Sequence, residues 1–368
     1  MTTTAHAAVL RSTDTPFSFE DVVLDDIRPT ELLIKIVATG LCHTDLAVVH
    51  GHIPAALPIV LGHEGAGIVE KVGEGVTDFA VGDHVAVSFA SCGHCENCLE
   101  GREAYCLKFM LLNIAGVRED GSGTMTAKDG GEMHGAFFGQ SSFASHSIVD
   151  QRNAVKISDS IPLELVGPLG CGIQTGAGTV LNSLDVRAGT SIAVSGTGAV
   201  GLAAIMAAKV AGATTIIAVD VLPERLEVAR TLGATHTING KTEDVVATIL
   251  EITGGLGANY GVDTTAVPQV IQNITAATRF GASVALLGVP KPDAVLPLGL
   301  ISGAGKTFIG AIEGDSVPQI FIPKLIALYE AGLFPFDQLV TLYPFDQIEK
   351  AIADTASGAA VKAVLTMP

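Results

Sequence analysis

The stretch that decides the fold is "TSIAVSGTGAVGLAAIMAAKVAGATTIIAVD", residues 190–220. An apolar run, "SIAV", leads into a turn in which Gly196, Gly198 and Gly201 have the G-x-G-x-x-G spacing. In that spacing the first glycine makes a tight turn, the second lets the backbone approach a pyrophosphate, and the third lets a helix pack on the strand. An alanine-rich run and a second apolar run follow. The stretch therefore predicts a βαβ unit of a doubly wound parallel sheet.

The same turn predicts a dinucleotide site. The helix would begin at Ala199 and Val200, where its free N–H groups and its dipole face the phosphates. Asp220 ends the second apolar run, about twenty residues on, where a carboxylate accepts hydrogen bonds from ribose hydroxyls and repels a 2′-phosphate, so NAD is favoured over NADP. Arg225 is a further candidate for contact with the ribose or a phosphate. The alternatives are a structural turn, a surface aspartate and a solvated arginine.

The chain has two kinds of sequence pattern, and its 368 residues are enough for two domains. Up to about Leu165, short apolar runs such as "ELLIKIVATGLC" and "GDHVAVSF" are bounded by Gly, Asp and Pro, which is typical of strands and turns. From there to about Glu313, apolar strands alternate with helical runs. The pattern predicts an α/β protein with a β-rich part and a parallel-sheet part.

Composition and charge narrow the class of protein. The formal net charge of −17 argues against a nucleic-acid or anionic-membrane surface. The N-terminal segment has no secretory signal pattern. Between Arg187 and Lys209 there is no charged residue, but glycines and serines interrupt this stretch, which favours a buried strand, turn and helix over a membrane span. We expect a cytoplasmic protein, and in that compartment cysteines are more often metal ligands or catalysts than disulfides.

Four of the six cysteines lie close together, in the stretch "SCGHCENCLEGREAYC". Their spacing is C-x2-C-x2-C-x7-C, which suits a tetrahedral zinc site with four thiolate ligands. An iron–sulfur run needs a final gap of about three residues followed by proline, and neither is present. A site with four protein ligands has no position left for a substrate, so we expect a structural zinc at Cys92, Cys95, Cys98 and Cys106.

The other two cysteines are far apart in the sequence. Cys42 lies in "GLCHTD" and Cys171 in "GPLGCGIQTGAG", with His63 between them in "GHEGAG". Two cysteines and one histidine would leave a fourth zinc position for water or substrate, as a catalytic zinc requires. The spacing alone leaves open that either cysteine is a small apolar core residue.

Together these motifs resemble the zinc-dependent medium-chain alcohol dehydrogenases, and the match runs along essentially the whole chain. "SFASCGHCENC" and "FFGQSSFASH" are most similar to the bacterial aryl-alcohol (benzyl alcohol) dehydrogenases and their geraniol-oxidising relatives. The resemblance implies a GroES-like catalytic domain formed by residues 1–172 and 313–368, and a Rossmann coenzyme domain formed by residues 173–312.

The resemblance also implies roles around the catalytic zinc. Its ligands would be Cys42, His63 and Cys171. Glu64 would lie close behind the metal, and Asp45 would hydrogen-bond and orient His63. The hydroxyl of Thr44 would accept the substrate proton and pass it to the nicotinamide ribose. For Glu64 and Asp45 the alternative is surface charge, and for Thr44 a local backbone contact.

For the cofactor, the resemblance implies that Thr175 lies beside the nicotinamide, that Val289 contacts the cofactor and that Lys362 reaches the pyrophosphate. His43 stands where many relatives carry an arginine, so it would be a shorter and pH-dependent cation toward the pyrophosphate and a possible substitute in the proton relay. Ala47 stands where many relatives carry the terminal histidine of the relay, which leaves the end of the relay open.

The expected activity is reversible, NAD-dependent oxidation of aromatic or allylic primary alcohols to aldehydes, with two zinc ions per chain. Phe89 would suit a flat substrate or belong to the core. A dehydrogenase for aliphatic alcohols, polyols or a glutathione adduct of formaldehyde is an alternative, as is a dinucleotide-binding zinc protein without catalysis. We expect a homodimer or homotetramer, because the family pairs sheet edges between copies.

Overall fold

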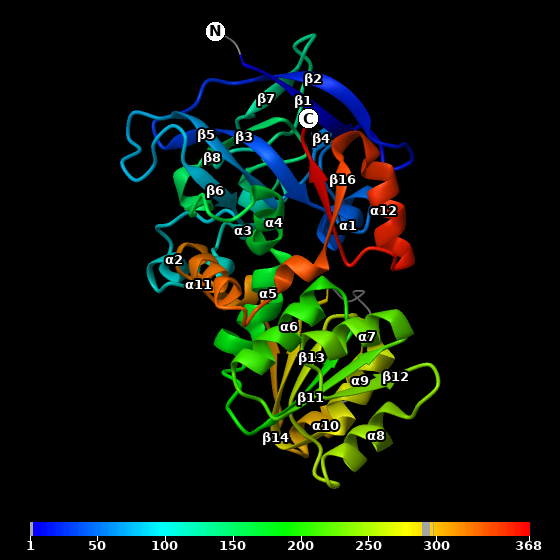
Figure 1. Ribbon diagram of the computed structural model, residues 1–368. Helices are drawn as coiled ribbons and strands as arrows, with labels where there is room; N and C mark the ends of the chain where they lie inside the picture. Colours follow the sequence, from blue (N-terminus) through cyan, green and yellow to red (C-terminus); the bar gives the residue numbers. More distant parts are fainter. Residues whose placement is uncertain (1–2, 289–294, 297) are drawn as a thin grey trace. The chain divides into compact units, whose positions relative to one another are not determined.

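The computed structural model describes residues 3–288, 295–296 and 298–368, and Val289, the expected cofactor contact, lies outside them. The chain forms two compact units (Figure 1). The first unit consists of Met1–Cys171, Val317–Lys324 and Asp337–Pro368. The second consists of Gly172–Ser316 and Leu325–Phe336.

The first unit is built on two mainly antiparallel sheets. Its larger sheet has the order β16-β17-β3-β5-β6-β9, with β8 paired to the first half of β3. Its strands are β3 (Glu31–Gly40), β5 (Gly65–Val72), β6 (His84–Val87), β8 (His146–Asp150), β9 (Ala154–Lys156), β16 (Val340–Pro344) and β17 (Lys362–Thr366). The smaller sheet has the order β4-β1-β2-β7 and is formed by β1 (Thr4–Leu10), β2 (Ser18–Leu24), β4 (Ile59–Val60) and β7 (Met125–Ala127).

The sequence explains the central position of β3. "ELLIKIVATG" is apolar at almost every position, and only Lys35 is exposed, as expected for a strand that is covered on both faces. The helices of this unit are short: α1 (His43–Val49), α2 (Glu96–Leu99), α3 (Phe109–Asn113), α4 (Leu163–Val166) and α12 (Ile348–Ser357). Helix α11 (Pro318–Glu330) begins in the first unit and ends in the second.

The second unit contains the parallel sheet that the glycine motif predicts, and the expected fold class is confirmed. All its strand pairs are parallel, in the order β12-β11-β10-β13-β14-β15. The strands are β10 (Ser191–Ser195), β11 (Thr215–Asp220), β12 (His236–Asn239), β13 (Ala258–Asp263), β14 (Thr278–Leu286) and β15 (Thr307–Gly310). The helices are α5 (Gly172–Gly178), α6 (Ala199–Val210), α7 (Pro223–Leu232), α8 (Val245–Ile252), α9 (Pro268–Ala277) and α10 (Leu298–Ser302).

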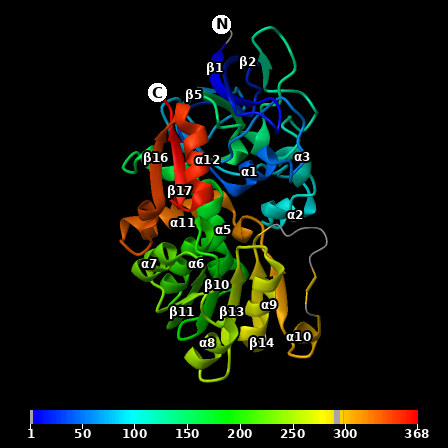
Figure 2. The ribbon, with the colours of Figure 1, turned by 90° about the vertical axis from the view of Figure 1, so that its right-hand side faces the viewer.

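The predicted βαβ unit is β10, the glycine turn, α6 and β11, and its strands are adjacent in the sheet (Figure 2). The middle of β10 and most of α6 are buried, which accounts for the long uncharged stretch in the sequence. None of the helices in the described ranges is long and apolar enough to cross a membrane.

Candidate functional site

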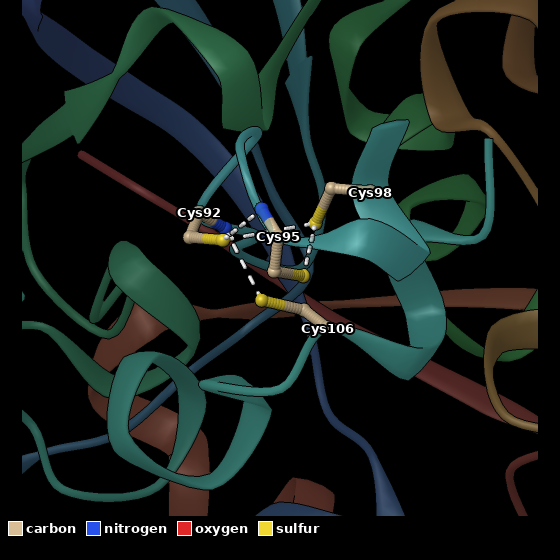
Figure 3. A group of neighbouring side chains, drawn as sticks. All are labelled: Cys92, Cys95, Cys98 and Cys106. Atoms are coloured by element: carbon tan, nitrogen blue, oxygen red, sulfur yellow. Dashed lines mark hydrogen bonds between the residues drawn. The ribbon is translucent and has the colours of Figure 1, made fainter. Parts of the chain in front are cut away.

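The four clustered cysteines converge in the first unit, with their sulfur atoms facing one another (Figure 3). Cys95 precedes α2, Cys98 lies in it, and their Sγ atoms are 3.5 Å apart. The Sγ atoms of Cys92 and Cys98 are 3.9 Å apart, and no disulfide links the cysteines. A tetrahedron with Zn–S bonds of about 2.3 Å has S–S edges of roughly 3.8 Å, so the four sulfurs fit a zinc ion.

The environment of these sulfurs also suits a cation. The backbone N–H of Cys92 donates to Cys106 Sγ at 3.3 Å, and that of Cys95 donates to Cys92 Sγ at 3.3 Å. Backbone N–H groups, those of Leu107 and Cys98 first, lower the pKa of Cys95 to about 6. Burial raises the pKa of Cys98 to about 12. At neutral pH Cys98 would stay protonated without a metal ion. A bound cation is therefore needed to hold all four residues as thiolates.

A second group of possible ligands forms from segments that are far apart in the sequence. Cys42 follows β3, His63 and Glu64 lie between β4 and β5, and Cys171 directly precedes α5. Their ligand atoms all lie within 4.8 Å of one another. His63 and Glu64 are fully buried and Cys171 nearly so. Cys171 lowers the pKa of Cys42 well below its usual value, with further contributions from His63 and Lys362 and against the effect of burial.

Asp45, in the first turn of α1, fixes the orientation of His63. Its Oδ1 lies 2.9 Å from His63 Nδ1 and accepts a hydrogen bond from Gly62 N at 3.1 Å. Its Oδ2 accepts one from Cys42 N at 3.0 Å, so one carboxylate joins two of the ligand segments. With the Nδ1 proton facing Asp45, the lone pair of Nε2 points away from the carboxylate.

The buried Nε2 atom of His63 tests whether a metal fits. It has no hydrogen-bond partner among the residues that the structure describes. Burying such an acceptor without a partner is unfavourable. A zinc ion held by Cys42, His63 and Cys171 would satisfy it. With Glu64 paired to Lys362, a set of three ligands would leave one tetrahedral position open. The donor set therefore fits a catalytic metal.

Glu64 and Lys362 form a buried ion pair next to this set. Lys362 Nζ donates to Glu64 Oε1 at 2.6 Å and to the backbone oxygen of Leu41 at 3.1 Å. Burial raises the pKa of Glu64 to about 7, against the opposing effect of Lys362. The resemblance implies that Glu64 lies close behind the metal, and the structure places its carboxylate within 4.8 Å of the other ligand atoms. Lys362, which the resemblance places at the pyrophosphate, is instead buried and paired with Glu64, since it begins β17, an interior strand of the sheet.

Thr44 and His43 also lie in the first turn of α1. Thr44 Oγ1 is 3.9 Å from Cys42 Sγ and its side chain is half-buried. The side chain of His43 is exposed. Ala47, on the same helix, has no group that could exchange a proton. Phe89 is buried and packs near Phe109, at 6.2 Å between ring centroids.

In the second unit, the glycine turn has the geometry that its spacing predicts. Gly196 has a φ of +86°, which an L side chain rarely adopts. A Cβ at position 201 would lie 1.8 Å from Gly196 O, so only glycine lets α6 approach the turn. A Cβ at position 198 would meet no described atom within 4 Å, which leaves room at the helix start. No side chain caps this helix, so the N–H groups at Ala199 and Val200 suit phosphate oxygens.

Asp220 and Arg225 lie beside the turn. Asp220 Oδ2 accepts hydrogen bonds from the backbone N and Oγ1 of Thr197, both at 2.6 Å. Its carboxylate therefore also holds the turn against β11. Arg225, in α7, is buried rather than solvated: burial lowers the pKa of its guanidinium, against the opposing effect of Asp220.

Thr175 lies in α5, which packs against the start of α6. A Cβ at position 176 would lie 2.0 Å from Val200 O, so the two helices touch there. Thr175 Oγ1 donates to Glu313 Oε2 at 3.4 Å, and Gln174 Nε2 donates to the same oxygen at 3.2 Å. Glu313 carries no signal in the sequence, because no local pattern marks a partner 138 residues away.

Sequence reasoning also missed the aromatic and amide side chains around His63. The ring of Phe138 stacks on the imidazole, with centroids 4.5 Å apart, and the ring of Phe137 meets it edge-on at 5.7 Å. Gln140 hydrogen-bonds to the backbone of His63. All three belong to "FFGQSSF", which the sequence analysis used only for its resemblance.

Comparison with known proteins agrees with this geometry. Residues 28–159 match the family model of the alcohol dehydrogenase GroES-like domain, and residues 199–330 match that of the zinc-binding dehydrogenases. Geraniol dehydrogenase from Castellaniella defragrans is 45% identical over 364 residues, which is 98% of this chain and 97% of the relative.

Two solved structures cover the whole chain and are covered completely by it. An alcohol dehydrogenase zinc-binding domain protein from Burkholderia ambifaria has a TM-score of 0.97 at 49% identity. Benzyl alcohol dehydrogenase from Acinetobacter calcoaceticus has a TM-score of 0.95 at 42% identity. With two family models, a full-length relative and the two ligand groups in agreement, the chain belongs to the zinc-dependent medium-chain alcohol dehydrogenases.

Proposed function

We propose that this protein oxidises aromatic or allylic primary alcohols to aldehydes with NAD as the hydride acceptor. The observation that carries the proposal is the set of Cys42, His63 and Cys171, in which the unpartnered Nε2 of the buried imidazole lies within 4.8 Å of both thiols. A set of three ligands keeps one position open for a substrate, whereas the four-cysteine set does not. We assign the catalytic zinc to the set of Cys42, His63 and Cys171 and a structural zinc to the four-cysteine set.

The residues around the three-ligand set of Cys42, His63 and Cys171 have different roles. A zinc ion there supplies Lewis acidity, which lowers the pKa of an alcohol. Asp45 keeps the Nδ1 proton of His63 in place, so that Nε2 remains a metal ligand. The hydroxyl of Thr44 would accept the alcohol proton and release its own. Because Ala47 has no proton-accepting group, the released proton would pass to water or to His43.

The cofactor would be held by the second unit. The N–H groups at the start of α6 bind the pyrophosphate, and Asp220 accepts the ribose hydroxyls while disfavouring a 2′-phosphate. Asp220 already accepts hydrogen bonds from Thr197, so its orientation does not depend on the cofactor. Thr175 would contact the nicotinamide, and NAD, when bound, would supply the hydride acceptor.

The substrate class has two supports. Geraniol and benzyl alcohol, the alcohols after which two relatives are named, both carry the CH2OH group on an unsaturated carbon. In this chain the rings of Phe137 and Phe138 flank the imidazole of His63. Flat, apolar rings next to the reacting centre suit a flat, apolar substrate. Aliphatic alcohols, polyols and thiol adducts of formaldehyde gain less from such neighbours.

We also propose that copies of the chain associate. Strand β15 is the edge of the six-stranded sheet, and among the described strands it pairs only with β14. An open edge can pair with the same edge of a second copy, which gives a homodimer that can pair again into a homotetramer. Light scattering on the purified protein measures this mass directly.

The test of the activity is NADH formation by purified protein with benzyl alcohol, geraniol and ethanol at equal concentration. We expect a higher kcat/KM for the first two. Activity on ethanol alone would keep the reaction and overturn the substrate class. No activity with any of the three, from protein that holds only one zinc ion per chain, would favour a non-catalytic dinucleotide-binding protein.

A further inference from the structure

The turn at residues 137–142 has unusual backbone geometry beside the metal-ligand set. Phe138, Gly139 and Ser141 have φ values of 50°, 62° and 50°. Left-handed conformations are uncommon for residues other than glycine, and they persist where surrounding contacts enforce them, often at functional sites. Here the turn presents two side chains to His63: the ring of Phe138, which stacks on the imidazole, and the amide of Gln140.

The amide of Gln140 pairs with the backbone on both sides of Glu64. Its Nε2 donates to His63 O at 3.0 Å, and its Oε1 accepts from Gly65 N at 2.9 Å. The side chain is fully buried. A Cβ at position 65 would lie 2.9 Å from Oε1, so glycine is needed for this approach. Where β5 begins, the side-chain amide thus makes the backbone hydrogen bonds that a neighbouring strand would otherwise make.

The same amide reaches the segment that carries the second ligand. Gln140 Nε2 also donates to Ser88 O at 3.2 Å. The hydroxyl of Ser88 donates to Gly170 O at 2.6 Å, and Gly170 directly precedes Cys171. Gln140 and Ser88 therefore form a buried chain of hydrogen bonds from the backbone of His63 to the backbone next to Cys171.

We propose that Gln140 is a positioning residue, which acts through Ser88 to fix the separation of the His63 and Cys171 ligand segments. The proposal rests on the metal set of the proposed function. Asp45 links His63 to Cys42, and Gln140 links the backbone of His63, through Ser88, to Gly170, which precedes Cys171. Without the amide, the His63 and Ser88 carbonyls lose a donor, and the set loses its fixed spacing.

The test is cadmium-113 NMR of the cadmium-substituted protein, because the shift depends on the number of sulfur ligands. The four-sulfur set then gives one signal, and the mixed set of two sulfurs and a histidine gives a separate one, the mixed signal. In Gln140→Met, of similar length but without the polar groups, we expect the mixed signal to shift or broaden and the four-sulfur signal to stay. Metal affinity of the mixed set should fall about 10- to 100-fold, the usual effect of losing a ligand's outer partner.

Two further variants separate positioning from general stability. Ser88→Ala removes the hydrogen bond to Gly170 by deleting only a hydroxyl group. If Gln140→Met does not fold, the same measurements on Ser88→Ala test the proposal. In the double variant, we expect no larger loss of affinity than in the worse single variant. Asn113→Asp is the matched control, because Asn113 is a buried amide that pairs in a similar way with the backbone of Ala90 but not with His63. It should leave the mixed signal in place.

The outcomes are distinct. An unchanged mixed signal and affinity in folded Gln140→Met or Ser88→Ala, or an equal change in Asn113→Asp, overturns the positioning role and leaves the proposed function standing. A wild-type protein with no mixed signal overturns both.

Discussion

The ammonium of Lys362 lies 2.6 Å from the carboxylate of Glu64, and both side chains are buried beside a cluster of metal-ligating groups. Burial would lower the pKa of Lys362, but Glu64, together with Cys42 and Cys171, outweighs it, so the pKa of this lysine is raised. A buried charge of this kind depends on its ion-pair partner, because water cannot reach the charge to stabilise it in place of that partner.

Lys362→Met should therefore destabilise the protein strongly. Removing one member of a buried pair leaves the other charge unpaired, at a cost of about 3–5 kcal/mol. Urea unfolding measures the loss. The control is Lys128→Met, since Lys128 pairs with Asp21 at 3.3 Å on the surface and should contribute less than about 1 kcal/mol. Adding Glu64→Gln to Lys362→Met should recover part of the stability, and equal effects of the two lysine variants would contradict this account.

Zinc content should separate the two metal sets. We expect two zinc ions per chain in the wild type, one for each ligand group. Cys98→Ala and Cys171→Ala should each retain one. Cys98→Ala should lower the temperature of unfolding more, because its set holds residues 92–106 together, while Cys171→Ala should abolish turnover. Metal analysis by mass spectrometry measures the counts, and a full complement in either variant would argue against the assignment.

Asp45→Asn should weaken zinc binding to the mixed set. The Asp45 carboxylate accepts the hydrogen bond from His63, and an amide can present its NH2 group there instead. Loss of such a partner typically lowers metal affinity about 10- to 100-fold. Competition with a chromophoric chelator measures it. Asp21→Asn is the control, because Asp21 contacts His6 at 3.3 Å on the surface; a similar loss there would show that the effect is not specific.

Asp220→Asn should lower the preference for NAD over NADP. The carboxylate favours ribose hydroxyls and repels a 2′-phosphate, and the amide removes that repulsion. The kcat/KM for NAD should fall about tenfold or more, since hydrogen bonds to a charged group contribute about 1.5–3 kcal/mol. Steady-state kinetics with both cofactors measure the ratio. Glu224→Gln, also near the start of α7, serves as the control, and an unchanged ratio in Asp220→Asn would remove Asp220 from the cofactor site.

Tyr343 should ionise at a higher pH than is usual for a tyrosine. Burial, aided by the hydrogen bond to Asp354 Oδ2 at 2.8 Å, raises the pKa of its hydroxyl to about 12. Because the pKa is higher in the folded state, this contribution to stability is complete below the usual value of 10.0 and is lost as the pH rises to about 12. Absorbance of tyrosinate during alkaline titration measures it. Asp354→Asn should shift this step to lower pH and Tyr343→Phe should remove it; an unchanged titration in both would refute the assignment.

The sequence predicts those features that depend on neighbouring residues. Gly196 and Gly201 must be glycines because of a positive φ and a 1.8 Å approach, both within one turn, so their spacing alone indicates the βαβ unit. The site of the four clustered cysteines can be predicted in the same way, because the short gaps between them limit where their sulfurs can lie. For Cys42 and Cys171 the residues alone left a core role open, and the family resemblance supplied the expectation.

The remaining features depend on contacts between distant parts of the chain. Lys362 and Glu64 are 298 positions apart, and the family resemblance places the lysine at the pyrophosphate rather than beside the glutamate. Gln140 and His63 are 77 positions apart, and a single glutamine carries no spacing signal. Such partners become visible only when strand order is known, because β17 and β5 both lie against β3.

The place of β17 also sets an order of events during translation. Residues Ala38–Gly40 of β3 pair with β17, and 321 positions separate Leu41 from Lys362. At about 5–20 residues per second, a ribosome needs roughly 15–60 s to cover that distance. All six strands of the second unit have been synthesised by Gly310, so its sheet is complete while the edge of β3 is still open. The unit that is begun first is therefore the last to be closed, because Glu64 acquires its partner Lys362 only after all strands of the second unit have been synthesised.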